Sequence, residues 1–215
     1  AWLGARTTRR VGVPQVLVEV GHGADESWHA RSLRRVGDWF WGRMVRRATS
    51  AVIAVDPLAQ ARVLQQGFEA ARVRLVPPGV DLEIYRPGLS SALVQRHHVR
   101  GRVILYLGHF SPGRGLETLI AAFGRSLAQV GDWTLVLAGE GPLRPHLRAQ
   151  IDRLGIGSNV HWLPEPTEAE LPGLLGASTL LAVPGEVREV RGQNIPKALA
   201  CGLPVLCSDL PALHY

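Results

Sequence analysis

Two basic side chains, His109 and Arg114, lie in a short glycine-rich stretch between an apolar run and a helical pattern. The run 103–107 is partly β-branched and ends at Gly108, which predicts a strand buried on both faces. The apolar spacing of 116–123 predicts a helix. Backbone N–H groups and the dipole at such a helix N-terminus attract an anionic oxygen. The stretch therefore indicates a phosphate-binding loop, although an ordinary strand-to-helix turn with solvated polar side chains explains these residues equally well.

A histidine, His22, follows another predicted strand at 15–20 and is flanked by Gly21 and Gly23. It would stand at the carboxyl end of a strand, where α/β sheets bind their ligands. A histidine in this position contacts a ligand in some proteins and serves only as a structural hydrogen-bonding group in others. These residues alone favour neither role.

A basic amphipathic helix is predicted over about 26–47. Apolar residues recur every three or four positions, and the opposite face carries arginines with tryptophans between them. Such a helix can lie on an anionic membrane surface. Packing on its own sheet, with the basic face in solvent, is the favoured of the two interpretations.

The composition indicates a globular protein that carries excess positive charge. The chain has 215 residues, of which 46% are hydrophobic and 20% charged, and its net charge is +6. A basic chain can bind nucleic acid, anionic lipid or a phosphorylated substrate, but no nucleic-acid-binding motif accompanies the charge. Cys201 and Cys207 are the only cysteines, which suits a reducing compartment better than a disulfide framework. We therefore expect a cytoplasmic protein that binds no nucleic acid.

Strands and helices alternate along the chain, which predicts an α/β fold of doubly wound parallel sheets. Further strands are expected to start near 51, 73, 133, 160, 179 and 204, and further helices at about 58–67, 143–154, 166–175 and 195–200. The pattern breaks at a polar segment rich in Pro, Gly and Ser. This break predicts a first domain at 1–86, a linker at 87–101 and a second domain at 102–215.

Five motifs follow one another in a distinctive order: RATSAVIAV at 47–55, VRLVPPGVDLEIYRP at 73–87, ILYLGHFSPGRG at 104–115, LVLAGEGP at 135–142 and ALACGLPV at 198–205. Their order and spacing resemble those of the GT-B glycosyltransferases of the family-4 type, the glycosyl transferases group 1. The resemblance implies two Rossmann-like domains of roughly 150–200 residues each. It therefore also implies a fragment truncated at both ends, in which the N-terminal domain is incomplete and the C-terminal domain lacks its end.

The resemblance implies a metal-independent retaining hexosyl- or glycosyltransferase of the EC 2.4 class that requires no cofactor. Its donor would be a nucleotide diphosphate sugar, and its acceptor a glycan, a lipid or a small molecule. The donor-binding loop would include Gly108, His109, Arg114 and Gly115. The protein would be cytoplasmic, and the basic helix 26–47 would offer a peripheral contact at the inner membrane face.

Two glutamates of the family pattern contact the donor, and only the first is conserved in type here. Glu189 occupies the first position, with Gly192 at the expected distance, and would contact the hydroxyls of the donor sugar. Lys197 occupies the second position, where the family carboxylate accepts hydrogen bonds from the nucleotide ribose; an ammonium group accepts none. His22 would touch the transferred sugar or handle a proton at the acceptor.

Three other positions depart from the family pattern. His109 replaces an arginine and carries a full charge only when it is protonated, whereas Arg114 replaces a lysine and can hold phosphate through two hydrogen bonds. Pro164 replaces a glycine. Lys197 and the missing ends keep open an alternative: a catalytically silent GT-B-like module that binds a nucleotide or a partner.

Overall fold

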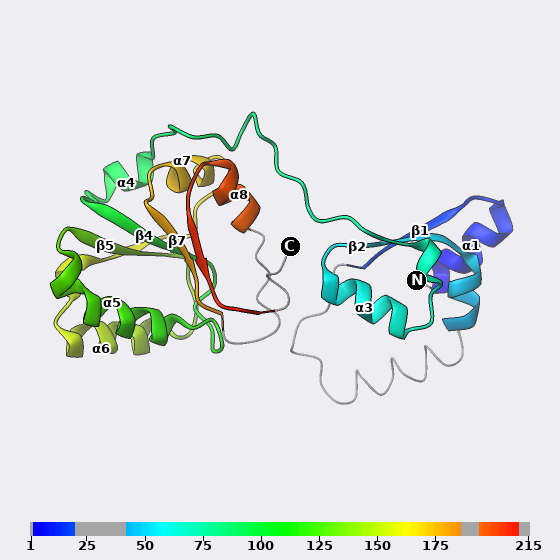
Figure 1. Cartoon of the computed structure of the whole chain (residues 1–215), viewed down its shortest axis with the longest axis horizontal. Coiled ribbons are helices and arrows are strands. Elements are labelled where there is room, and N and C mark those ends of the chain that lie inside the picture. The colour runs from blue at the N-terminus through cyan, green and yellow to red at the C-terminus, as the bar shows by residue number, and fades with distance from the viewer. Residues whose placement is uncertain (1, 20–41, 186–193, 211–215) are drawn as a thin grey trace. The chain divides into compact units, whose positions relative to one another are not determined.

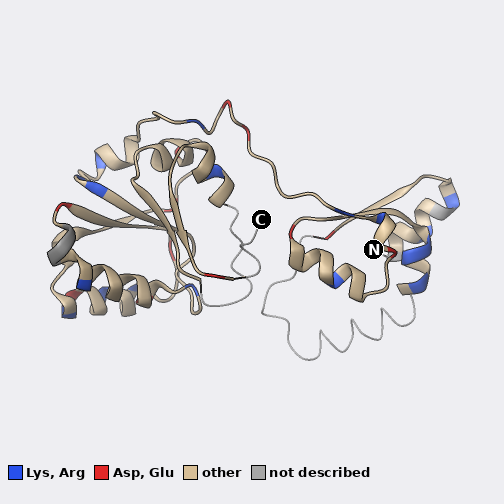
Figure 2. Cartoon of the chain, in the orientation of Figure 1, with Lys and Arg blue, Asp and Glu red and all other residues tan. Residues whose placement is uncertain are grey.

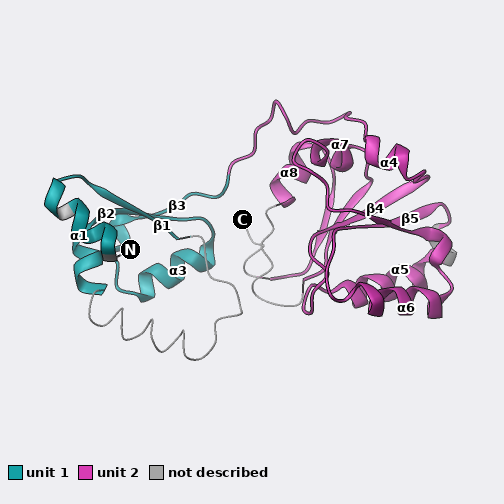
Figure 3. Cartoon of the chain, turned by 180° about the vertical axis from the view of Figure 1, so that it is seen from behind, with its two compact units in different colours: residues 1–78, 214–215 teal, residues 79–213 magenta. Residues whose placement is uncertain are grey.

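The computed structural model describes residues 2–19, 42–185 and 194–210, which belong to two compact units (Figures 1 and 3). Unit 1 comprises Ala1–Pro78 with His214–Tyr215, and unit 2 comprises Gly79–Leu213. Each unit contains one sheet, and every strand pair in both sheets is parallel. The predicted α/β fold with parallel sheets is confirmed. No helix in the described ranges is long and apolar enough to cross a membrane.

Unit 1 has a three-stranded sheet in the order β1-β2-β3. Its elements are α1 (Trp2–Val11), β1 (Gln15–Glu19), the helical residues 42–48, β2 (Thr49–Ala54), α3 (Pro57–Gln65), the 3-10 turn η1 (Ala70–Arg72) and β3 (Val73–Leu75). Residues of β2, α3 and β3 form the core of the unit: Val52, Ala54, Ala59, Val63 and Val73. Only the end of the helix predicted at 26–47 falls within the described residues.

The ends of α3 are set by local hydrogen bonds. Asp56 caps the N-terminus by accepting a backbone N–H at 2.6 Å. At the other end, the N–H of Gly67 donates to Leu64 at 2.9 Å and the N–H of Phe68 donates to Val63 at 3.4 Å. This is a Schellman arrangement, in which Gly67 adopts φ 82° and Phe68 packs back on the core. The glycine predicted to end this helix thus directs the chain toward η1.

Unit 2 has a five-stranded sheet in the order β6-β5-β4-β7-β8. Its elements are α4 (Ala92–Arg96), β4 (Arg102–Leu107), α5 (Leu116–Val130), β5 (Trp133–Ala138), α6 (Arg144–Leu154), η2 (Gly157–Asn159), β6 (Val160–Leu163), α7 (Leu171–Gly176), β7 (Leu180–Val183), α8 (Asn194–Ala200) and β8 (Val205–Cys207). Figure 1 shows α5 and α6 along one face of the sheet, and α4, α7 and α8 along the other.

Both faces of the unit 2 sheet are buried, because alternate strand residues point to opposite sides. Leu105 and Val136 belong to the cluster that includes α7 and α8, whereas Tyr106 and Leu137 belong to the cluster that includes α5 and α6. The segment predicted as a linker contains α4, and Leu93 of α4 is buried in the first of these clusters.

The strand order reverses at β4, which lies between β5 and β7. From β4 the chain proceeds to β5 and β6 on one side, and then crosses to β7 and β8 on the other. Tyr106 is in register with Leu137 of β5 and with Ala182 of β7, so the carboxyl ends of the three strands are level. Doubly wound sheets bind their ligands outside such a reversal point. The loops after β4 and β7 therefore flank the expected binding crevice.

Candidate functional site

The loop after β4 meets the segment after β7 at Gly115. This residue is the N-cap of α5 and has φ 70°, a conformation that side chains disfavour. A Cβ atom added to Gly115 would stand 1.5 Å from the carbonyl oxygen of Pro184. Only glycine therefore allows the N-terminus of α5 to approach the end of β7. The glycine expected in the donor loop is placed at the reversal point of the sheet.

The loop is also bonded to the turn after β5, which contains the second glycine motif. The N–H of Phe110 donates to the carbonyl of Glu140 at 2.7 Å, and the N–H of Leu143 donates to the carbonyl of Phe110 at 3.0 Å. A Cβ on Gly139 would stand 2.1 Å from the carbonyl oxygen of Gly108. Two motifs that are separate in the sequence are thus joined by backbone hydrogen bonds.

A buried tyrosine beneath the loop was missed by the sequence interpretation, in which it was only part of a strand. The hydroxyl of Tyr106 donates to the carbonyl of His109 at 3.2 Å. Burial raises the pKa of Tyr106 to about 12, and the nearby positive charge of Arg114 opposes that shift. The aromatic ring of Phe110, itself fully buried, lies 6.1 Å from that of Tyr106. These side chains hold the loop from inside the core.

The side chains of the loop leave positive charge at the reversal point of the sheet. Arg114 is half-buried and His109 is exposed. The loop leads into the 15-residue helix α5, which has no side-chain cap at its N-terminus because its N-cap is Gly115. No carboxylate in the described ranges forms an ion pair with Arg114. A guanidinium and a helix N-terminus on one loop suit an anionic ligand.

Lys197 of α8 is held by two other side chains of unit 2. Its Nζ lies 3.6 Å from Oε2 of Glu168 and 5.3 Å from the centre of the Tyr85 ring. The hydroxyl of Tyr85 also lies 3.5 Å from Oε2 of Glu168. One quarter of the Lys197 side chain is exposed, against 86% of Glu168. The lysine that replaces the family glutamate is therefore paired with a carboxylate from the loop before α7.

Three of the residues predicted to contact the donor sugar or the acceptor, His22, Glu189 and Gly192, lie outside the described residues. Gly108, His109, Arg114 and Gly115 lie together in the loop after β4, and Lys197 lies on the helix that follows β7. Within residues 2–19, 42–185 and 194–210, no three His, Cys, Asp or Glu side chains gather into a possible metal site.

A basic, glycine-rich loop at the reversal point of a Rossmann-like sheet is shared by a broad class of proteins. Comparison with known families narrows that class. The family described as "Glycosyl transferases group 1" matches residues 94–214, and "Glycosyltransferase Family 4" matches residues 1–84. The chain belongs to the glycosyl transferases group 1 family. The resemblance seen in the sequence motifs is confirmed.

Similar proteins support the same family. "D-inositol 3-phosphate glycosyltransferase" of Mycobacterium tuberculosis is 29% identical over 189 residues, which cover 84% of this chain. The chain spans 38% of the length of that relative. A crystal structure of Anabaena HepE in complex with UDP matches 98% of this chain and 57% of its own, with a TM-score of 0.79 and 25% identity.

The fold recurs at lower identity. Sucrose-phosphate synthase from Thermosynechococcus elongatus is 19% identical and matches 99% of this chain and 55% of its own, with a TM-score of 0.70. This likeness supports the GT-B type of fold and its Rossmann-like domains.

Proposed function

We propose that the chain belongs to a retaining glycosyltransferase of the EC 2.4 class that transfers a sugar from a nucleotide diphosphate sugar. In this proposal residues 102–215 bind the donor, residues 1–86 form the acceptor side, and 87–101 connect them. The observation that carries the proposal is the convergence of Arg114, the N-terminus of α5 and the end of β7 at the sheet reversal point. UDP in the similar HepE structure supports a nucleotide donor.

The chemical demand of the reaction is the departure of the nucleotide diphosphate. When the bond between the anomeric carbon and the phosphate oxygen breaks, negative charge develops on that oxygen. Arg114 and the N-terminal dipole of α5 would stabilise this charge without rearrangement, because the loop is already bonded to the core. His109 would add a full charge only when it is protonated. The proposed scheme uses no metal ion.

The remaining roles follow from the family resemblance. Glu189, with Gly192 after it, would bind hydroxyls of the donor sugar. The acceptor oxygen would bond to the anomeric carbon on the face that the diphosphate leaves, which retains the configuration. His22 would contact the sugar or take part in the transfer of the acceptor proton. The acceptor would be a glycan, a lipid or a small molecule, and membrane contact through 26–47 stays a prediction.

Nucleotide binding tests the loop assignment. We expect UDP, titrated calorimetrically, to bind about 10–100-fold more weakly to Arg114→Ala, because the charge-assisted hydrogen bonds of a guanidinium contribute about 1.5–3 kcal/mol. Arg125→Ala is the matched control, since Arg125 is exposed on the same helix, α5. Equal affinity of both variants would remove Arg114 from the donor site.

A second candidate function is nucleotide binding without transfer. The observation that favours it is Lys197, whose ammonium group is occupied by Glu168 at 3.6 Å where the family pattern has a ribose-binding carboxylate. Consumption of UDP-glucose, with or without an acceptor, separates the two functions. An enzyme would lose most turnover in Glu189→Ala, whereas a silent module would bind UDP in an Arg114-dependent way and consume no donor.

A further inference from the structure

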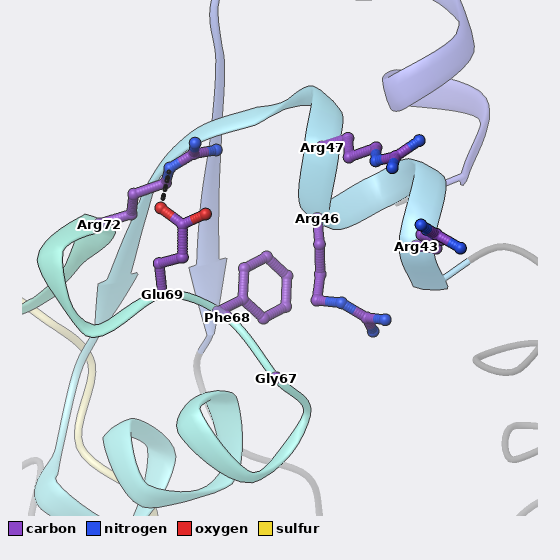
Figure 4. A pocket seen from close by; sticks show the side chains of 7 residues that line it. All are labelled: Arg43, Arg46, Arg47, Gly67, Phe68, Glu69 and Arg72. Atoms are coloured by element: carbon purple, nitrogen blue, oxygen red, sulfur yellow. Dashed lines mark ion pairs between the residues drawn. The ribbon is translucent and has the colours of Figure 1, made fainter.

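A second basic site lies in unit 1, whereas the loop after β4 belongs to unit 2. A cavity of about 530 Å³ is lined by the helix 42–48 and by the segment between α3 and β3 (Figure 4). Its lining residues are Arg43, Arg46, Arg47, Gly67, Phe68, Glu69 and Arg72. A volume of this size suits a small-molecule ligand. Four guanidinium groups against one carboxylate favour an anion.

Two of these arginines are held in place by the protein itself. Nη1 of Arg46 donates to the carbonyl of Gln66 at 3.0 Å, and Nη1 of Arg72 donates to the carbonyl of Thr49 at 3.2 Å. Arg72 also pairs with Glu69, the one acidic residue of the lining, at 3.0 Å. The Schellman turn after α3 supplies the Gln66 carbonyl, so local backbone geometry fixes one wall of the cavity.

The other two arginines carry charge that the described part of the chain does not neutralise. Arg43 and Arg47 are exposed, and no hydrogen bond or ion pair to either is found among the described residues. The ring of Phe68 lies between Arg46 and the Glu69–Arg72 pair and gives the cavity one apolar surface (Figure 4). Planar guanidinium groups bind phosphate oxygens through paired hydrogen bonds.

The strand topology separates this cavity from the carboxyl edge of its sheet. The helix 42–48 leads directly into β2, and η1 leads directly into β3, so both lining segments lie at the amino ends of parallel strands. Ligands of doubly wound sheets bind at the opposite, carboxyl edge. Figure 2 shows further basic residues on α1 in the same unit.

We propose that this cavity, which we call the arginine pocket, binds the phosphate group of a phosphorylated small molecule or of a lipid headgroup. Arg43 and Arg47 contact the phosphate oxygens. Arg46, held by the Gln66 carbonyl, adds a further positive charge, whereas the charge of Arg72 is balanced by Glu69. The carbon skeleton next to the phosphate lies against Phe68. This site is additional to the proposed donor site and does not depend on it.

The test uses inorganic pyrophosphate as the probe and the Arg114→Ala variant as the background, so that the loop after β4 contributes little binding. Heteronuclear NMR locates the probe through the amides of Gly67 and Phe68. In this background we compare Arg43→Gln/Arg47→Gln with the control pair Arg62→Gln/Arg74→Gln. Arg62 and Arg74 belong to the same unit but not to the pocket lining, and the control removes the same charge.

We expect pyrophosphate to shift both amides saturably, and to bind at least about tenfold more weakly when Arg43 and Arg47 are replaced. The control pair should change the affinity less than about twofold, as expected for solvent-screened charges that do not line the pocket. If both pairs of substitutions weakened pyrophosphate binding equally, the effect would come from the net charge of the chain, and the pocket assignment would be wrong. Absence of any shift at Gly67 and Phe68 with millimolar pyrophosphate, together with no vesicle binding that depends on Arg43 and Arg47, would overturn the proposal.

A second arm distinguishes the source of the phosphate. The same variants are sedimented with phosphatidylcholine vesicles that contain or lack phosphatidic acid. Binding to phosphatidic acid that is lost with Arg43 and Arg47 would assign the pocket to a lipid headgroup. Pyrophosphate binding without such vesicle binding would assign it to a soluble phosphorylated molecule. Vesicle binding that persists in the double variant, with no pyrophosphate binding, would contradict both assignments.

Discussion

The ammonium group of Lys197 on α8 lies 3.6 Å from a carboxylate oxygen of Glu168, which comes from the loop that precedes α7. The aromatic ring of Tyr85 lies beside the same ammonium group, at 5.3 Å. A position where the family pattern has an acid therefore carries a base, and a carboxylate from a different loop stands next to it. The positive charge of Lys197 is thus accompanied by the negative charge of Glu168.

Lys197→Gln should bind UDP about 3–10-fold more tightly than the native chain. The amide oxygen of glutamine can accept a hydrogen bond from a ribose hydroxyl, which lysine cannot, and one such bond contributes about 0.5–1.5 kcal/mol. Lys197→Met is the control, because it keeps an apolar stem next to Tyr85 but accepts no strong hydrogen bond. Calorimetric titration measures the difference. Weaker binding in both variants would instead show that the lysine itself holds the nucleotide.

Gly115→Ala should destabilise unit 2 by more than about 3 kcal/mol. The alanine would have to adopt a left-handed backbone conformation, and its Cβ would stand 1.5 Å from the Pro184 carbonyl oxygen. The loss of stability therefore includes a clash with the backbone. Gly155→Ala, at the C-cap of α6, is a matched control: it has the same left-handed conformation, with φ 66° and ψ 23°, but no atom lies within 4 Å of an added Cβ. This control should lose only the free energy of unfolding that a side chain costs in the left-handed conformation, about 1–2 kcal/mol. Urea unfolding followed by circular dichroism compares the two, and equal losses would refute the close approach of the loop to Pro184.

Periodicity and motif order predicted most of the fold of unit 2, because its strands are buried on both faces and its helices are amphipathic. Local hydrogen bonds decided what the patterns could not. The helix expected from 166 begins at Leu171, since both the N–H and the hydroxyl of Thr167 donate to the Glu170 carboxylate and form a turn first. The helix α1 was not predicted, although the few apolar residues of its mostly polar, arginine-rich sequence gather on one side of the helix.

The sequence predicted those parts of the candidate site that are contiguous in the chain, but not the contacts between distant segments. Gly108 to Gly115 form one loop and were identified together. The packing of Gly139 against that loop depends on the pairing of β4 with β5, which glycine spacing does not reveal. The partners of Lys197 come from segments far along the chain, so nothing in the sequence near Lys197 indicated its pairing with Glu168.

Tyr106 should remain protonated in the folded chain up to about pH 12, because burial raises its pKa to about 12 from an ordinary value of 10.0. In the unfolded chain the same hydroxyl ionises near pH 10. Between these values the folded state binds more protons than the unfolded state, so stability falls as the pH rises from about 10 to about 12. Tyrosinate absorbance, compared between the native chain and Tyr106→Phe, identifies the late-titrating group among the three tyrosines.

The Tyr106→Phe variant also tests the support of the donor loop. It removes the hydrogen bond to the His109 carbonyl, which should cost about 1 kcal/mol of stability at neutral pH. It should also weaken UDP binding severalfold, since the loop that carries Arg114 loses one of its attachments to the core. Tyr85→Phe, whose hydroxyl is close to Glu168 instead, should leave the late titration unchanged. A late-titrating tyrosine that survives in Tyr106→Phe would show that the buried hydroxyl is not the one beneath the loop.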